Sequence, residues 1–161
     1  MSDVYRINRI LVPVDGSEFS RHAAEHAVQL AQALGPAAPA GPPTELIFLH
    51  VVDSQIVEQL AQQRRDGEPE VRDRLFEQGR VYLRDVAQLA VAHDVPHTED
   101  VQEGDPCAVI CDTAVARDVG LIVMGKIGRR GARRILVGSI TRRVIECCDR
   151  AVLVVSGPPA A

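Results

Sequence analysis

Short apolar runs alternate with longer amphipathic segments along the chain, and this alternation restricts the folds that the chain can adopt. The apolar runs contain β-branched residues and have the length of strands that are buried on both faces. They cover residues 7–14, 45–52, 120–124 and 151–155, with a weaker run at 96–102. Apolar residues at helical spacing mark residues 17–34, 70–92, 105–119 and 139–148. This alternation predicts an α/β fold in which helices wrap a parallel sheet through right-handed crossovers.

Several residues mark the ends of these segments. Gly35 follows the first helical segment, where a left-handed C-terminal cap is expected. Residues 36–44 contain four prolines, which fix φ and remove hydrogen-bond donors, so this stretch is predicted to be a loop. The polar stretch 53–69 has room for a short helix followed by a turn. Asp105 before Pro106 is typical of a helix start.

Length and composition exclude several classes of protein. A chain of 161 residues fits a single domain that buries roughly two thirds of its unfolded surface. A net charge of -4 and 3% aromatic residues argue against nucleic acid as a partner. No apolar run approaches the ~18 residues of a membrane-spanning helix, and no leader is apparent, so a cytoplasmic protein is expected. The cysteines lack the spacing of a zinc site or of a secreted disulfide framework, which favours reduced thiols.

The segment from Gly125 to Gly138 joins a predicted strand to a predicted helix and is rich in glycine and arginine. Glycines let backbone N–H groups approach phosphate oxygens, and the helix N-terminus beyond Gly138 adds further donors. Lys126 and four arginines concentrate positive charge here, which suits a polyanion. Alternatively, the glycines only make turns and the arginines are solvated. The spacing is neither that of a P-loop nor that of a dinucleotide fingerprint.

Asp15 is the second candidate for a ligand-binding residue. In parallel sheets, ligands bind beyond the carboxyl ends of the strands where the strand order reverses. If the first strand is central and the fourth pairs beside it, the loops after Val14 and Met124 form opposite walls of such a crevice. The Asp15 carboxylate would then accept hydrogen bonds from an adenine or a ribose. An N-terminal helix cap is the alternative, and both roles are compatible.

These residues resemble the universal stress protein family. Gly125-x-x-Gly128, nine residues and then Gly138-Ser139 are similar to the nucleotide-binding signature of that family. The resemblance extends to most of the chain through three further segments, which are VPVDGS at 12–17, LHVV at 49–52 and AVLVV at 151–155.

The resemblance implies a fold and a set of binding residues. The family fold is an open, Rossmann-like sheet of five parallel strands in the order 3-2-1-4-5, with helices on both faces. The ligand would be ATP, or AMP or ADP, with Mg bound through the phosphates. The resemblance implies a set of residues that contact the adenine, ribose and phosphates, and Arg129 is added as a basic residue of the loop. The full set of candidate binding residues is Pro13, Asp15, Val51, Met124, Gly125, Gly128, Arg129, Gly138, Ser139 and Ile140. Relatives commonly form homodimers through their last strand, here Val152 to Val155.

Two features depart from the family pattern. Many relatives carry a small hydroxyl residue and a histidine where this chain has Lys126 and Ile127, so phosphate contacts are expected to differ. The proline-rich segment 36–43 is longer than usual. The signature glycines and Ser139 are all present, which favours nucleotide binding.

Other reactive side chains have structural interpretations. His22 and His26 stand four residues apart, a spacing that can share a metal, but no third ligand is evident and surface positions are expected. Cys107 and Cys111 are also one helical turn apart. Apolar packing is their expected role, and a reactive thiol at Cys107 is the alternative.

No serine–histidine–acid set, paired carboxylates or metal cluster can be assembled, so no dedicated catalytic residues are assigned. The leading hypothesis is a nucleotide-responsive signalling or stress-response regulator. One alternative is a slow ATPase or a phosphoryl or nucleotidyl transferase that uses the same pocket, because charge and positioning alone assist phosphoryl transfer. The other alternative is a dimeric adaptor that binds no nucleotide.

Overall fold

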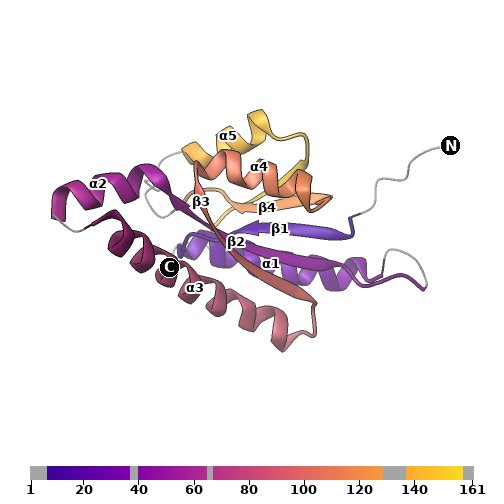
Figure 1. The fold of residues 1–161 in the computed structure, drawn as a ribbon. Helices are drawn as coiled ribbons and strands as arrows, with labels where there is room; N and C mark the ends of the chain where they lie inside the picture. Colours follow the sequence, from indigo (N-terminus) through magenta and orange to yellow (C-terminus); the bar gives the residue numbers. More distant parts are fainter. Residues whose placement is uncertain (1–6, 37–39, 65–66, 129–136, 158–161) are drawn as a thin grey trace.

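The computed structural model describes residues 7–36, 40–64, 67–128 and 137–157, and its centre is one parallel sheet (Figure 1). The order of the strands is β3-β2-β1-β4-β5, and each neighbouring pair is parallel. This confirms the predicted α/β fold and strand order. The strands are β1 (Arg9–Pro13), β2 (Glu45–Asp53), β3 (His97–Gly104), β4 (Leu121–Gly125) and β5 (Ala151–Val155).

Helices cover both faces of this sheet (Figure 1). They are α1 (Glu18–Leu34), α2 (Ser54–Arg64), α3 (Glu68–Ala92), α4 (Pro106–Ala116) and α5 (Ser139–Cys147). The helices α1 and α3 pack on one face, whereas α4 and α5 pack on the other. The helix α2 packs on α3 beyond the end of β2. Among the described residues, no helix is both long and apolar enough to span a bilayer.

The apolar runs form strands because each faces a helix layer on both sides. Along β2, Phe48 belongs to the core under α1 and α3, and its neighbours Ile47 and Leu49 belong to the core under α4 and α5. All three side chains are fully buried. A strand that is covered on both faces needs continuous rather than alternating apolar residues. This explains why β1, β2 and β4 are the clearest strands in the sequence.

The third strand differs most from its prediction. It covers His97–Gly104 rather than 96–102, and it pairs with β2 from Leu46↔His97 to Asp53↔Gly104. Its side chains are mostly polar and largely half-buried because β3 is an edge strand. Its backbone pairing with the long β2, rather than its own apolar pattern, makes it a strand.

The ends of α1 lie close to their predicted positions, although the N-cap is Ser17 and not Asp15. The side chain of Ser17 accepts a hydrogen bond from the Ser20 amide at 3.1 Å and caps the first turn. Gly35 closes the last turn at φ 58°, a left-handed value that favours glycine, and its amide donates to the Ala31 carbonyl. The helix α3 begins at Glu68, two residues before its predicted start at residue 70, with Pro69 in its first turn.

Candidate functional site

The candidate site lies at the carboxyl edge of the sheet, between β1 and β4. Leu11 of β1 pairs with Ile122 of β4, so the two strands end side by side. After β1 the chain enters α1 on one face, and after β4 it enters α5 on the other. The loops therefore diverge to opposite sides of the sheet, as expected at the point where strand order reverses.

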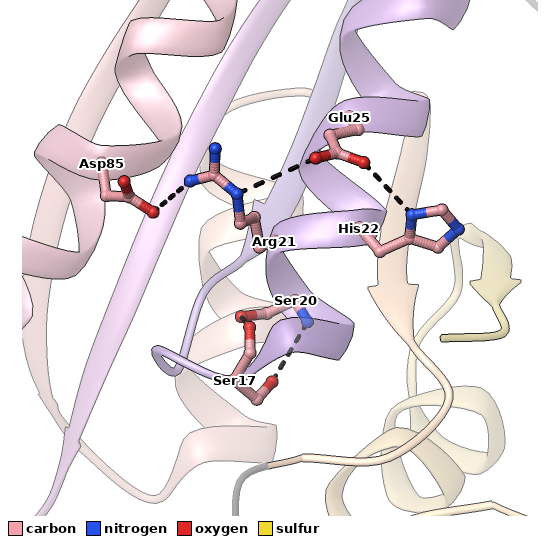
Figure 2. A network of polar contacts seen from close by, with 6 residues as sticks. All are labelled: Ser17, Ser20, Arg21, His22, Glu25 and Asp85. Carbon is pink, nitrogen blue, oxygen red and sulfur yellow. Dashed lines mark hydrogen bonds and ion pairs between the residues drawn. The ribbon is translucent and has the colours of Figure 1, made fainter. Parts of the chain in front are cut away.

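Asp15 organises the wall formed by the β1–α1 turn. Its Oδ1 accepts hydrogen bonds from the Ser17 amide at 3.0 Å and from the Ser17 hydroxyl at 2.5 Å. The capping residue of α1 is thus Ser17, and Asp15 holds that cap in place instead of being the cap itself. Figure 2 shows Ser17 and Ser20 in this first turn. Arg21, one residue further on, bridges Asp85 of α3 and Glu25.

Gly128 brings the β4 loop against Asp15. A Cβ atom on Gly128 would lie 2.8 Å from Oδ2 of Asp15, closer than real Cβ contacts. The other Asp15 oxygen is the one that holds Ser17. The β1–α1 turn and the loop after β4 therefore meet at one carboxylate oxygen and one glycine, at the place where the sequence predicts a ligand.

Backbone hydrogen bonds close the β4–α5 connection at its base. The Lys126 amide donates to the Val155 carbonyl at 2.8 Å, and the Gly138 amide donates to the Lys126 carbonyl at 2.8 Å. The hydroxyl of Thr141 donates to the Gly125 carbonyl at 3.0 Å. These bonds fix the start of α5 beside the end of β4. Residues 129–136, which include the predicted site residue Arg129, lie outside the described residues.

The N-terminus of α5 has an extended glycine as its cap. Gly138 has φ -63° and ψ 156°, and as a glycine it has no side chain with which to cap the first turn. Ser139 and Ile140 follow as exposed residues. The first N–H groups of a helix have no partner within the helix, and together with the helix dipole they favour an anion. This end of α5 is the part of the crevice best suited to phosphate.

The remaining predicted site residues lie on the strands β1, β2 and β4. Pro13 ends β1. Met124 is 5% exposed and packs with Val51 in the core under α4 and α5, so these two side chains face that layer. Gly125 faces α1, because a Cβ atom there would stand 2.8 Å from the backbone carbon of Phe19. Glycine at this position therefore serves helix packing.

His50 is a residue of this region whose role the sequence does not indicate. Its Nδ1 donates to the Val14 carbonyl at 2.7 Å, and its ring meets the Tyr82 ring edge-on at 5.5 Å. Burial lowers the pKa of His50, while the bond to Val14 and the nearby charge of Asp15 oppose this shift. Gly79 leaves room for the ring, because a Cβ atom there would lie 2.3 Å from it. His50 thus holds Val14, the residue that follows β1, through this hydrogen bond.

The cysteines depart from the expectation of reduced thiols. Cys111 of α4 and Cys148, the C-cap of α5, form a disulfide with 5.4 Å between their Cα atoms. Cys107 and Cys147 are free. Spacing along the chain does not reveal this pair, because it depends on how α4 and α5 pack.

His22 and His26 show no metal site. Their ring centroids are 4.7 Å apart, and Nδ1 of His22 contacts Glu25 at 3.2 Å. Within the described residues, no group of three or more histidine, cysteine, aspartate or glutamate side chains is placed to hold a metal ion. Two shallow hollows of about 410 and 340 Å³ lie along α3, away from the crevice.

Comparisons with known proteins agree with the fold. Residues 6–156 match the Universal stress protein family. Universal stress protein MJ0531 of Methanocaldococcus jannaschii is 33% identical over 151 residues, which cover 93% of this chain and 82% of that protein. The solved structure of MJ0577 from the same organism has a TM-score of 0.77 at 25% identity, and the match covers 97% of this chain and 99% of that one.

Two solved structures of similar fold contain adenine nucleotides. A family protein from Arabidopsis thaliana was solved with AMP bound; its TM-score is 0.63 at 14% identity, over 94% of this chain and 93% of that one. Another universal stress protein was solved in complex with cAMP; its TM-score is 0.62 at 21% identity, over 94% of this chain and 98% of that one. At these identities the likeness to this chain concerns the fold.

Proposed function

The chain belongs to the universal stress protein family, and from this membership we propose that it is a cytoplasmic stress-response protein that binds ATP between β1 and β4. Bound nucleotide would order the β4–α5 connection and so change the surface that a partner protein meets. The observation that carries this proposal is the meeting of Asp15, Gly128 and the N-terminus of α5 at one crevice. No residue is assigned to catalysis.

The crevice offers separate surroundings for the two ends of the ligand. Asp15, held by Ser17, would accept hydrogen bonds from the adenine or ribose, with Pro13 and Val51 supplying apolar contact. The amides of Ser139 and Ile140 in the first turn of α5 would donate to phosphate oxygens. The Gly138 amide is bonded to the Lys126 carbonyl, so Gly138 would contribute by letting the phosphates come close. Gly128 would come close to the ligand because it lacks a Cβ atom. Mg²⁺ would bind through the phosphates.

An adenine nucleotide as the ligand is supported by solved structures of the family that contain AMP and cAMP. Lys126 follows β4 directly, and Arg129 and further arginines follow in the sequence. This positive charge favours the longest phosphate chain, so we propose ATP over AMP or ADP.

The direct test is to release the nucleotide that co-purifies with the protein by acid denaturation and to identify it by anion-exchange chromatography. Finding ATP supports the proposal. If purified protein contains no nucleotide and added ATP does not raise Tm, the adaptor alternative is favoured. Phosphate release that scales with protein and disappears on Gly138→Val would instead favour the slow ATPase.

A matched pair of glycine substitutions tests whether the N-terminus of α5 binds the phosphates of the nucleotide. Gly138 caps α5 and Gly67 caps α3 with nearly the same backbone angles, φ -63° against -65° and ψ 156° against 149°. A Cβ atom on Gly138 would stand 3.5 Å from the Gly128 amide nitrogen, where it would crowd an anion. We expect Gly138→Ala to weaken ATP binding about tenfold, or about 1.4 kcal/mol, by isothermal titration calorimetry. Gly67→Ala should bind as the unaltered protein does, and equal losses would contradict the assignment.

We also propose that two copies pair through β5. This strand lies at the sheet edge, and Leu153 is 41% exposed on it. Edge pairing would cover backbone groups that otherwise invite aggregation. We expect sedimentation of a homodimer, and of a monomer for Leu153→Glu, because like charges would face each other across the two-fold axis. Val115→Glu, at an exposed apolar residue of α4, is the control and should stay dimeric. A dimer that survives Leu153→Glu places the interface elsewhere.

A further inference from the structure

All four cysteines of the chain gather where α4 meets α5. Cys107 and Cys111 stand one turn apart on α4, and Cys147 and Cys148 are consecutive at the end of α5. The disulfide between Cys111 and Cys148 links the two helices. Residues four apart on a helix lie on one face, so Cys107 stands on the same side of α4 as the bridged Cys111.

The two free cysteines form a second pair beside the disulfide. Cys107 precedes the bridged Cys111 by one turn of α4, and Cys147 directly precedes the bridged Cys148, so the two free cysteines flank the disulfide. Cys107 is 4% exposed, whereas Cys147 is exposed. One thiol of the pair can therefore meet a reagent from solvent, and the other is shielded behind it.

A fixed positive charge stands next to this pair. The guanidinium of Arg143 donates to both carboxylate oxygens of Asp105 at 3.0 Å each, and it lies close enough to both thiols to interact with them electrostatically. Burial raises the pKa of Cys107, and Arg143 opposes this shift. The thiolate is the form of a cysteine that attacks disulfides.

We propose that the four cysteines form a reversible thiol–disulfide site, in which Cys147 exchanges with a small-molecule disulfide and Cys107 resolves the product into a second bridge. The Cys147 thiolate attacks one sulfur of the small disulfide, whose S–S bond breaks and releases one small thiol. The Cys107 thiol then gives up its proton and attacks Sγ of Cys147, which expels the second small thiol. Two protein thiols lose two electrons and two protons, and the small disulfide is reduced to two thiols.

This proposal does not rest on the proposed nucleotide binding, because its chemistry uses only these cysteines. The reverse reaction needs a small thiol as reductant, and the cytoplasmic location proposed above would supply one. In the doubly bridged form, α4 and α5 are joined by Cys107–Cys147 as well as by Cys111–Cys148.

The test uses the full chain and oxidised glutathione as the probe. Purified protein is incubated with and without the probe, denatured, alkylated at its free thiols and weighed intact by mass spectrometry. We expect two alkylated thiols before treatment, at Cys107 and Cys147, and none afterwards, with no glutathione retained. The tryptic peptides that contain Cys107 and Cys147 should then be joined by two bridges instead of one.

Two variants separate the attacking cysteine from the resolving one. In Cys107→Ser, Cys147 should retain glutathione as a stable mixed disulfide because the resolving thiol is gone. Cys107→Ala, which keeps an apolar group at this buried position, serves the same purpose if serine unfolds the protein, as judged by circular dichroism. In Cys147→Ser, neither a second bridge nor an adduct should form, and Cys107 should stay available to alkylation after denaturation.

Three results would overturn the proposal. The first is a stable glutathione adduct on the unaltered protein to the same extent as on Cys107→Ser. The second is oxidation that links Cys147 of two chains. The third is a thiol count that does not change with the probe, or that shows four thiols from the outset and after treatment.

Discussion

Gly128→Val is expected to weaken ATP binding by about 100-fold, or about 2.7 kcal/mol. The Cβ atom alone would stand 2.8 Å from Oδ2 of Asp15, and the two methyl groups of valine would enlarge the conflict. Either Asp15 moves away from the ligand or the loop moves away from Asp15. In both cases the adenine and phosphate ends of the crevice are no longer held together. Isothermal titration calorimetry with nucleotide-free protein measures the loss.

The control for this prediction compares the affinity losses of two single variants with the loss of the double variant. If the valine acts by displacing Asp15, then Asp15→Ala and Gly128→Val combined should lose little more affinity than the weaker-binding single variant. Fully additive losses would show that Gly128 acts independently of Asp15. Unchanged affinity in Gly128→Val would place the nucleotide outside this crevice, and Tm of the free variant shows whether the fold survives.

Phe48→Ala is expected to lower the free energy of unfolding by about 3 to 5 kcal/mol. Phe48 is fully buried in the core under α1 and α3, and β2 is the strand that pairs with both β1 and β3. Removing the ring leaves a cavity that neighbours on two strands and two helices cannot close without shifting. Urea denaturation followed by circular dichroism gives the loss.

Phe76 provides the matched comparison, because it is half-buried on α3 and lines a surface hollow. Phe76→Ala should cost clearly less than Phe48→Ala, since water and mobile side chains already reach that ring. Equal losses from the two variants would contradict the core position given to Phe48.

The sequence predicts those elements whose apolar pattern is local. The strands β1, β2, β4 and β5 appear as apolar runs, and α1 is marked at its C-terminal end by Gly35. The strand β3 is weak in the sequence because its side chains are polar, and its extension to Gly104 depends on pairing with β2. Helix α3 begins earlier than predicted because Glu68 and Pro69 suit a first turn despite their polarity.

In the candidate site, too, some features are predicted from the sequence and others depend on tertiary packing. The glycines of the loop and Asp15 are predicted because each follows a recognisable strand. The bond between His50 and Val14 joins residues 36 apart in the sequence, and the disulfide joins residues 37 apart. Both depend on which faces of helices and strands pack together, and local spacing carries no information about that.

Helix α5 is only nine residues long, with Gly138 at one end and Cys148, bridged to Cys111, at the other. A helix this short transmits a displacement of one end to the other almost rigidly. Thermodynamic linkage then imposes reciprocity: any factor by which a bridge to α4 changes nucleotide affinity is also the factor by which nucleotide changes the equilibrium of that bridge. The concentration of adenine nucleotide and the redox state of the thiols would therefore both act on helix α5, and each would change the response of the protein to the other.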